Sequence, residues 1–186
     1  MAKYFSIFRA QKSAQMELKR YTAYFTFPVG QLEISSDESY ILSIWFTDAQ
    51  KRQAPNLPES TVVPPVIDQC IAELGEYFAG TRKEFSVPYL LQGTDFQINV
   101  WNELTKIPYG QTITYGQQAA RLQNEKAIRA VGTSNGLNRL SILIPCHRVI
   151  GANGSLVGYG GDLWVKKWLL EHEQKHSSGL VQMRLF

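Results

Sequence analysis

The 186-residue chain predicts an α/β (α+β) fold that begins with a β-sheet and continues with helices. Two observations support this prediction. Before residue 48, runs rich in β-branched and aromatic residues alternate with turn residues, as in antiparallel strands. After residue 93, apolar residues recur at helical spacing behind capping signals. We therefore expect an N-terminal sheet with a helix, and then a helical C-terminal domain that contains a helix-turn-helix.

Three strands and one helix are predicted in the first half. The strands run from Tyr21 to Phe27, from Gly30 to Ser35 and from Tyr40 to Thr47. The helix runs from Pro65 to Phe78, because apolar residues share one of its faces (Ile67, Ile71, Leu74 and Phe78). Cys70 lies beside that face, so a buried structural thiol explains it best.

Composition shifts divide the chain into four parts. We expect an N-terminal extension (1–19), a sheet-and-helix domain (20–92), a second domain (93–176) and a flexible tail (177–186). The tail opens with Ser-Ser-Gly, which is typical of a flexible link.

The second domain contains two capping boxes. Thr94 with Gln97 begins one helix, and Thr114 with Gln117 begins another. Asn124 is expected to cap a third helix, from Glu125 to about Asn135. The second and third helices form a helix-turn-helix pattern, in which the third is the recognition helix.

The recognition helix has a small outer face. At 100° per residue its buried side holds Ala127, Ile128 and Val131, and its outer side holds Arg129, Gly132, Thr133 and Gly136. A glycine costs a helix about 1 kcal/mol relative to alanine, so two of them need a reason. Close approach of another surface supplies one, and a frayed helix end with a solvated arginine is the alternative.

Cys146 is the candidate nucleophile. It follows the apolar run Ser141–Ile144, which predicts a short buried strand, and Pro145, which ends that strand. His147 is its neighbour in the sequence. A residue at such a junction is presented by a rigid scaffold, but a structural thiol is the alternative interpretation.

Charge and cysteine content limit the class of protein. No apolar run approaches the roughly 18 residues of a membrane span, and two cysteines make no disulfide framework, so a cytoplasmic location is expected. Residues 1–93 hold 9 basic and 10 acidic residues, whereas residues 94–186 hold 10 and 6. The basic excess lies in the half with Cys146, as a polyanionic partner would favour.

These motifs, in this order, resemble the O6-alkylguanine-DNA alkyltransferases (methylated-DNA–protein-cysteine methyltransferases). The resemblance covers about Tyr21 to Gln174. It is carried by Val100-Trp101, Ile107-Pro108-Tyr109-Gly110, Thr114-Tyr115, Arg129-Ala130-Val131-Gly132, Asn138, Ile144-Pro145-Cys146-His147-Arg148, Asn153-Gly154, Gly158-Tyr159 and Lys167-Trp168-Leu169-Leu170-Glu171-His172-Glu173.

The resemblance implies a ribonuclease-H-like N-terminal domain and a DNA-repair reaction. Cys146 would accept, once and irreversibly, the alkyl group of O6-alkylguanine, and also of O4-alkylthymine, in double-stranded DNA. His147 would relay the thiol proton through water, oriented by Glu173. A monomer in the bacterial nucleoid, with no metal and no organic cofactor, is implied.

The resemblance also implies how DNA binds. The recognition helix would enter the minor groove, and Arg129 would fill the stack left by a flipped nucleotide. Tyr115 would push the 3′ phosphate aside and touch the base. The expected DNA-contacting set is Tyr115, Arg129, Gly132, Thr133, Gly136 and Asn138.

A substrate pocket is implied around Cys146. Asn138 would hold the turn before the cysteine, and Tyr159 would cover the alkyl group. The backbone carbonyls of Val149 and Cys146 would bind the guanine amino group. The chain departs from some relatives here: Gly160 stands in place of a hydroxyl residue, and Arg139 and Ser141 stand in place of prolines.

The chemistry requires a thiolate. A free thiol of pKa about 8.5 is only a few per cent ionised at neutral pH, but nucleophilicity falls as pKa falls. We therefore expect a moderately lowered pKa for Cys146.

Three other functions compete with alkyl transfer. They are a damage-sensing module similar to the alkyltransferase-like proteins, which lack the cysteine, a helix-turn-helix regulator, and a Cys-His peptidase.

The last five residues, Gln182-Met183-Arg184-Leu185-Phe186, resemble the tails by which bacterial repair proteins bind the sliding clamp. Met183, Leu185 and Phe186 would fill an apolar groove, and Gln182 would anchor the tail by hydrogen bonds. The alternative is a tail that packs on its own domain.

Overall fold

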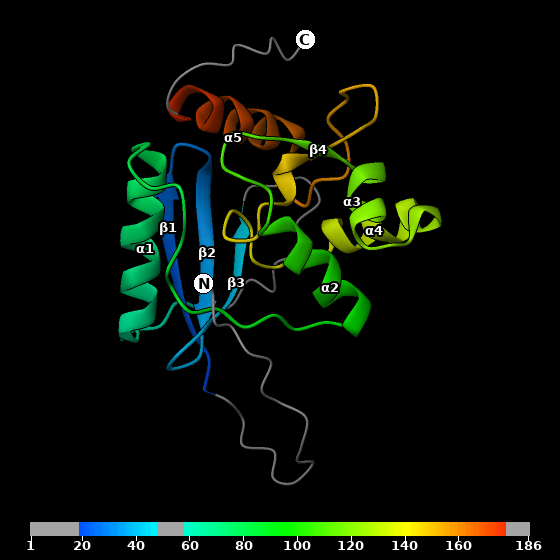
Figure 1. Ribbon diagram of the computed structural model, residues 1–186. Coiled ribbons are helices and arrows are strands. Elements are labelled where there is room, and N and C mark those ends of the chain that lie inside the picture. The colour runs from blue at the N-terminus through cyan, green and yellow to red at the C-terminus, as the bar shows by residue number, and fades with distance from the viewer. Residues whose placement is uncertain (1–18, 48–57, 178–186) are drawn as a thin grey trace, which may run out of the picture.

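The computed structural model describes residues 19–47 and 58–177. The N-terminal half is an antiparallel sheet in the order β1 (Tyr21–Phe27), β2 (Gly30–Ser36) and β3 (Ile41–Phe46) (Figure 1). All three predicted strands are confirmed to within one residue at each end. Gly30 begins β2 at φ 99°, a left-handed conformation that favours glycine, so its place after the turn is explained by backbone geometry.

Helix α1 (Pro65–Phe78) lies beside the sheet, with the predicted bounds. Phe78 stacks on Phe27 of β1 with ring centroids 4.9 Å apart. Cys70 is fully buried in this layer, and burial raises the pKa of its thiol far above the ordinary value. The interpretation of Cys70 as a core residue is confirmed.

The second half is helical, and both capping boxes are present. Helices α2 (Asp95–Leu104) and α3 (Tyr115–Arg121) follow Thr94 and Thr114. Each threonine hydroxyl accepts a hydrogen bond from the backbone N–H three residues later, at 3.3 and 3.1 Å. The matching glutamine side chains accept from the threonine N–H groups at 2.9 and 2.7 Å.

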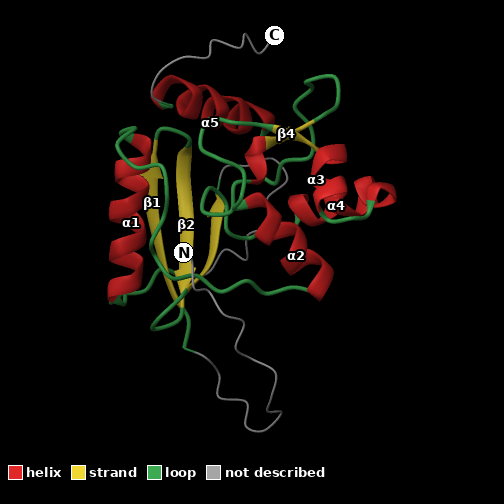
Figure 2. Cartoon of the chain, in the orientation of Figure 1, coloured by secondary structure: helices red, strands yellow, loops and turns green. Residues whose placement is uncertain are grey.

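The third predicted helix is shorter than expected. A 3₁₀ turn at Glu125–Ala127 precedes helix α4 (Ile128–Gly136), and Asn124 makes no side-chain cap. Gln123 turns the chain at φ 56°, which ends α3 and leaves too few residues for a regular first turn. The start at Glu125 and the cap at Asn124 were wrong, but the pair of helices is confirmed (Figure 2).

The buried side of α4 also differs in part. Val131 is buried, together with Ser134 and Asn135, but Ile128 is 47% exposed. Ile128 is the first residue of α4 and lies one turn before Val131, the first buried residue of the helix. The outer side agrees with the expectation, because Arg129 and Thr133 are exposed.

The run Ser141–Ile144 is buried, as expected, but it is not a strand. Ile142 has φ 73°, so the run folds into a tight turn closed by a bridge between Ser141 and Ile144. Three consecutive apolar residues do not distinguish a buried strand from a buried turn, which explains the wrong prediction. Cys146 begins a 3₁₀ turn, η2 (Cys146–Arg148).

Two backbone hydrogen bonds join β3 of the N-terminal half to the segment before Cys146. The N–H of Ile44 in β3 donates to the carbonyl of Arg139 at 2.7 Å, and the N–H of Ser141 donates to the carbonyl of Ile44 at 3.3 Å. The turn before Cys146 is therefore fixed against the N-terminal sheet.

Strands β4 (Ile113–Thr114) and β5 (Val149–Ile150) form a second, parallel pair.

Helix α5 (Leu163–His176) completes the structure at the ends of the sheet and α1 (Figure 1). His172 stacks on Trp168 with centroids 4.8 Å apart, and its Nε2 lies 2.7 Å from the carbonyl of Tyr77 in α1. Within residues 19–47 and 58–177, no helix is both long and apolar enough to cross a bilayer.

A buried carboxylate supports α1. Glu73 accepts hydrogen bonds from the hydroxyl and N–H of Ser86, from the N–H of Val87 and from Gln69. Burial would raise the pKa of Glu73, but these hydrogen bonds, led by those of Ser86 and Gln69, hold it below its usual value.

We predict that Glu73→Ala lowers the free energy of unfolding by about 2 to 3 kcal/mol, because it leaves buried donors without an acceptor. The matched control is Glu76→Ala, whose carboxylate pairs with Arg82 at the surface and should cost under about 1 kcal/mol. Urea unfolding of both variants measures the difference. Equal losses would contradict the anchoring role of Glu73.

Candidate active site around Cys146

Asn138 holds the turn that presents Cys146. Its side-chain amide donates to the carbonyl of Ile144 at 2.8 Å and to the Cys146 sulfur at 3.2 Å. Its Oδ1 accepts from the N–H of Leu140 at 3.0 Å. One buried amide thus links the end of α4 to the thiol, as expected for Asn138.

Cys146 is only 2% exposed. Burial raises the pKa of its thiol above the ordinary value, and the Asn138 hydrogen bond and the Lys166 ammonium only partly offset that rise. The moderately lowered pKa that we expected is therefore wrong, because desolvation outweighs the local donors. A resting thiol must lose its proton before it can react.

Glu173 of α5 is fully buried and contacts four other residues. Its Oε1 lies 2.8 Å from Nε2 of His147, and it accepts from the Tyr77 hydroxyl at 2.9 Å. The Arg148 guanidinium donates through Nε to Oε2 at 2.9 Å and through Nη2 to Oε1 at 3.0 Å. The N–H of Gly110 donates to Oε2 at 3.0 Å.

This network fixes the charge and tautomer of His147. Burial alone would raise the pKa of Glu173, but His147 and Arg148 hold it well below its usual range, so it is ionised. Burial lowers the pKa of His147, and Glu173 only partly restores it, so the imidazole is neutral at neutral pH. A neutral imidazole beside a carboxylate carries its proton on Nε2, which leaves Nδ1 as the basic atom.

Nδ1 of His147 is buried and has no hydrogen-bond partner among the described residues. Buried polar atoms are normally paired, often with a water molecule. The atom therefore fits a proton acceptor that works through water beside the thiol.

Three partners of Glu173 were not predicted. Arg148 is part of the motif around Cys146, but its spacing gives no sign that it would turn back to α5. Tyr77 lies 96 residues away in the sequence, and no local pattern connects it to Glu173. Gly110 contributes only its backbone, at φ 75°.

Lys166 is another site residue that was not predicted. Its ammonium is fully buried and donates to the carbonyls of Val149 and Val157, both at 2.7 Å. Burial lowers the pKa of Lys166 to about 8. Helical spacing could have identified Lys166, because it lies three residues before Leu169 and seven before Glu173 and so shares their face of the helix. The carbonyl of Val149 keeps one lone pair for another donor.

A loop closes the site. The Tyr115 hydroxyl donates to the carbonyl of Val157 at 2.8 Å. Tyr159 is half-buried, with its hydroxyl oxygen inside the protein, and burial, followed by the charge of Cys146, raises the pKa of its phenol well above the ordinary value. A Cβ built on Gly160 would lie 3.4 Å from the carbonyl of Gly136. The expected DNA-contacting residue Tyr115 and the expected pocket residue Tyr159 thus lie close to the thiol, and the expected pocket residue Gly160 lies close to the end of α4.

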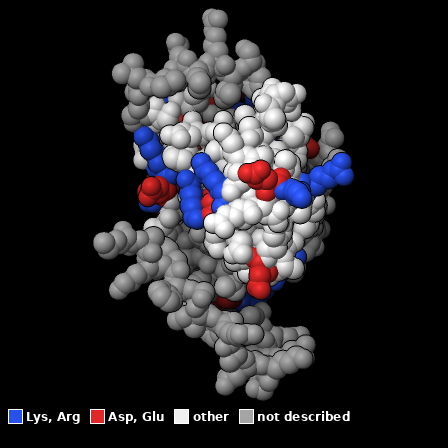
Figure 3. All heavy atoms as spheres, turned by 45° about the vertical axis from the view of Figure 1, so that its right-hand side comes forward, with Lys and Arg blue, Asp and Glu red and all other residues white. Residues whose placement is uncertain are grey.

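The outer face of α4 is smoother than its own packing requires. A Cβ on Gly136 would meet nothing within 4 Å, and one on Gly132 would lie at an ordinary 3.8 Å from the Tyr115 ring. The packing of the described residues therefore gives no steric reason for glycine at either position. Figure 3 brings this side forward and shows a largely uncharged surface on which both basic and acidic side chains are scattered.

Buried amides hold α4 in place. Gln118 of α3 and Asn135 exchange side-chain hydrogen bonds at 2.7 and 3.4 Å. The indole N–H of Trp101 in α2 donates to the carbonyl of Ser134 at 2.8 Å. These polar contacts were not predicted, because periodicity identifies only the apolar face.

Comparisons with known proteins agree with this geometry. Residues 20–91 match the family description "6-O-methylguanine DNA methyltransferase, ribonuclease-like domain", and residues 95–175 match "6-O-methylguanine DNA methyltransferase, DNA binding domain". A protein of Methanosarcina acetivorans named methylated-DNA–protein-cysteine methyltransferase is 42% identical over 154 residues, which are 82% of this chain and 97% of the relative.

Solved structures are similar as well. That of Mycobacterium tuberculosis O6-methylguanine methyltransferase has a TM-score of 0.74 at 36% identity, covering 87% of this chain and 97% of the other. That of Mycobacterium tuberculosis OGT in complex with DNA has a TM-score of 0.75 at 37% identity, covering 84% and 93%. The expected fold class is confirmed, and the chain belongs to the family of methylated-DNA–protein-cysteine methyltransferases.

Proposed function

We propose that this protein repairs DNA by transferring the alkyl group of O6-alkylguanine, and of O4-alkylthymine, to the sulfur of Cys146 in a single irreversible turnover. The observation that carries the proposal is the buried contact between His147 and Glu173, which leaves Nδ1 of the neutral imidazole without a partner among the described residues, in the residue next to the buried Cys146. The names of the relatives support the same activity.

The step balances as a displacement at a saturated carbon. The thiol proton passes through water to Nδ1 of His147, and the ionised Glu173 stabilises the resulting imidazolium. The sulfur then bonds to the alkyl carbon, and the carbon–O6 bond breaks with its electron pair leaving on the guanine. The guanine takes up a proton from water, and the imidazolium of His147 returns its proton to water, so the proton lost by the thiol is balanced by the proton gained by the base. The product is a thioether, which water does not hydrolyse.

Base flipping is part of the proposal. Cys146 is buried, so a base inside a duplex cannot reach it unless the nucleotide is extruded. The unused space beside Gly132 and Gly136 fits a helix that enters the minor groove, with Arg129 projecting into the stack. The loop that holds Tyr159 and Gly160 must move to admit the base. Thr133 and Asn138 complete the proposed contact set, and the protein would act as a monomer.

Binding to the sliding clamp is a separate proposal. Gln182, Met183, Leu185 and Phe186 lie outside the described residues, as do residues 1–18 of the predicted extension. Deletion of residues 182–186 should abolish capture by the host clamp and leave the rate of alkyl transfer unchanged. Loss of activity without any clamp binding by the intact chain would show that the tail is structural.

The first prediction of the mechanism concerns stoichiometry. After incubation with a duplex carrying O6-methylguanine, intact mass should rise by one methyl group per molecule, and a second addition of substrate should have no effect. Peptide mapping should place the methyl on Cys146. Cys70→Ala is the matched control and should react normally. Repeated turnover, or methylation of Cys70, would exclude the mechanism.

A second prediction separates DNA binding from chemistry. Arg129→Ala should slow repair of a methylated duplex by at least tenfold, because no side chain would then fill the gap that the flipped nucleotide leaves in the base stack. The single-turnover rate with free O6-methylguanine base should stay close to that of the unaltered protein. Thr133→Ser, which keeps the small outer face, is the control. Equal losses on both substrates would assign Arg129 to the pocket or the fold.

A third prediction concerns pH. With His147 neutral as the base, the rate with free O6-methylguanine should be nearly flat from about pH 7 to 8 and fall as His147 is protonated in acid. Glu173→Gln should be slower at pH 7, and its rate should rise with pH because hydroxide must now ionise a thiol of raised pKa. Thermal unfolding checks that the variant is folded. A parallel pH profile would remove Glu173 from the relay.

A further inference from the structure

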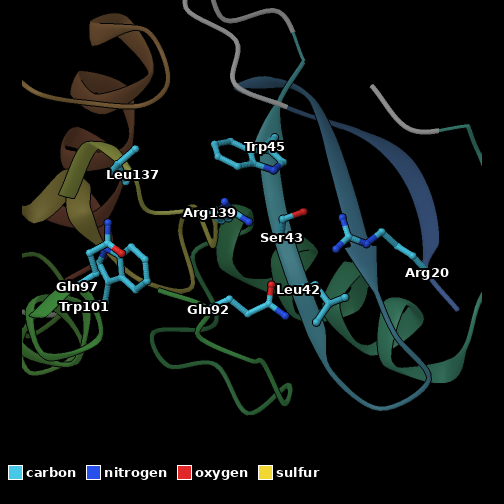
Figure 4. A pocket seen from close by; sticks show the side chains of 9 residues that line it. All are labelled: Arg20, Leu42, Ser43, Trp45, Gln92, Gln97, Trp101, Leu137 and Arg139. Carbon is cyan, nitrogen blue, oxygen red and sulfur yellow. The ribbon is translucent and has the colours of Figure 1, made fainter. Parts of the chain in front are cut away.

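A polar groove lies away from Cys146, between β3 and α2. Its volume is about 300 Å³, at the lower end of small-ligand sites. It is lined by Arg20, Leu42, Ser43, Trp45, Gln92, Gln97, Trp101, Leu137 and Arg139, and we call it the Arg139 groove. Figure 4 shows Trp101 and Gln97 on one side, β3 with Ser43 and Trp45 on the other, and Arg139 between them.

The described residues that line the groove carry only positive charge. Arg20 and Arg139 are among them, and no aspartate or glutamate of the described part of the chain is. Neither arginine pairs with a carboxylate of the described residues, in contrast to Arg82, which pairs with Glu76. Two guanidinium groups with no acidic neighbour in the groove create a positive potential, and their planar forks match the oxygens of a phosphate group.

The walls of the groove are fixed before any ligand binds. The backbone of Arg139 is held by the hydrogen bond from Ile44 of β3, at 2.7 Å. The indole of Trp101 is held by its bond to the carbonyl of Ser134. The Ser43 hydroxyl lies 2.7 Å from that of Ser35. A site with such walls loses little conformational freedom on binding.

We propose that the Arg139 groove binds a phosphate group of a nucleotide. The side-chain amides of Gln92 and Gln97 and the Ser43 hydroxyl supply additional donors around the two arginines, and the indoles of Trp45 and Trp101 supply apolar walls. A volume of about 300 Å³ fits a ligand of the size of one nucleotide unit and is too small for a duplex. The phosphate is either part of a DNA strand or carried by a free nucleoside monophosphate.

The place of the groove favours the DNA strand. Leu137, which lines the groove, directly follows α4, the proposed recognition helix, and Asn138, which holds the Cys146 sulfur, lies between Leu137 and Arg139. Leu137 and Arg139 follow Gly136, the last residue of α4, so a DNA strand bound along the outer face of α4 would reach the groove at the C-terminal end of that helix. For this source the inference rests on the proposed function; for a free nucleotide it does not.

The first experiment measures affinity for an undamaged duplex against salt concentration. Each lost phosphate contact lowers the slope of log affinity against log salt by about 0.9. Arg139→Gln and Arg20→Gln should each lower the slope by about this amount. Lys175→Gln, which removes a cation on the exposed side of α5, is the matched control and should leave the slope unchanged. Thermal unfolding verifies that each variant is folded.

The second experiment measures binding of dCMP and of inorganic phosphate by calorimetry. Binding of dCMP by the unaltered protein that is lost in Arg139→Gln, with unchanged DNA slopes, would identify the free nucleotide as the source. Reduced slopes without dCMP binding would identify the strand. Unchanged slopes together with no nucleotide binding would overturn the inference.

Repair of a methylated duplex by the unaltered protein, measured in parallel, keeps the two proposals separate. If repair occurs while the groove variants show no change in either experiment, only the groove is excluded. If no repair occurs, the proposed function fails, and the calorimetric result still decides whether the groove binds a nucleotide.

Discussion

The buried carboxylate of Glu173 is the interaction on which most of the structure depends. It accepts hydrogen bonds from α1 through Tyr77, from the segment before β4 through Gly110, and from η2 through His147 and Arg148. A buried charge costs several kcal/mol unless it is paired and fully hydrogen-bonded. Glu173 meets both conditions, so its place is specified by electrostatics as well as by the apolar face of α5.

The same carboxylate joins folding to chemistry. Tyr77 belongs to the N-terminal half and His147 to the proposed reacting centre, and both contact Oε1. The orientation of the imidazole therefore depends on how α1 and α5 pack. Asn138 has a comparable role on the other side of the thiol, where it connects α4 to the sulfur. The Cys146 turn is supported from two directions by single polar side chains.

Sequence reasoning succeeded where the signal was local. The capping threonines Thr94 and Thr114, the alternating strands and the amphipathic α1 each depend on residues within one element. It failed where conformation depends on tertiary structure. Ile142 adopts a left-handed φ that a β-branched residue rarely takes, and no pattern around it predicts that turn. The raised pKa of Cys146 likewise follows from burial, which the motif does not contain.

The closed loop over Cys146 has a consequence for how long the unreacted protein lasts. A protonated, enclosed thiol reacts slowly with peroxides and dissolved electrophiles, since these attack exposed thiolates. On the proposed mechanism each molecule reacts once, so any side reaction removes that molecule from service permanently. On that mechanism, the burial of Cys146 preserves the supply of intact thiols between episodes of damage, and a cell's capacity for repair is set by how many protein copies it has kept unmodified.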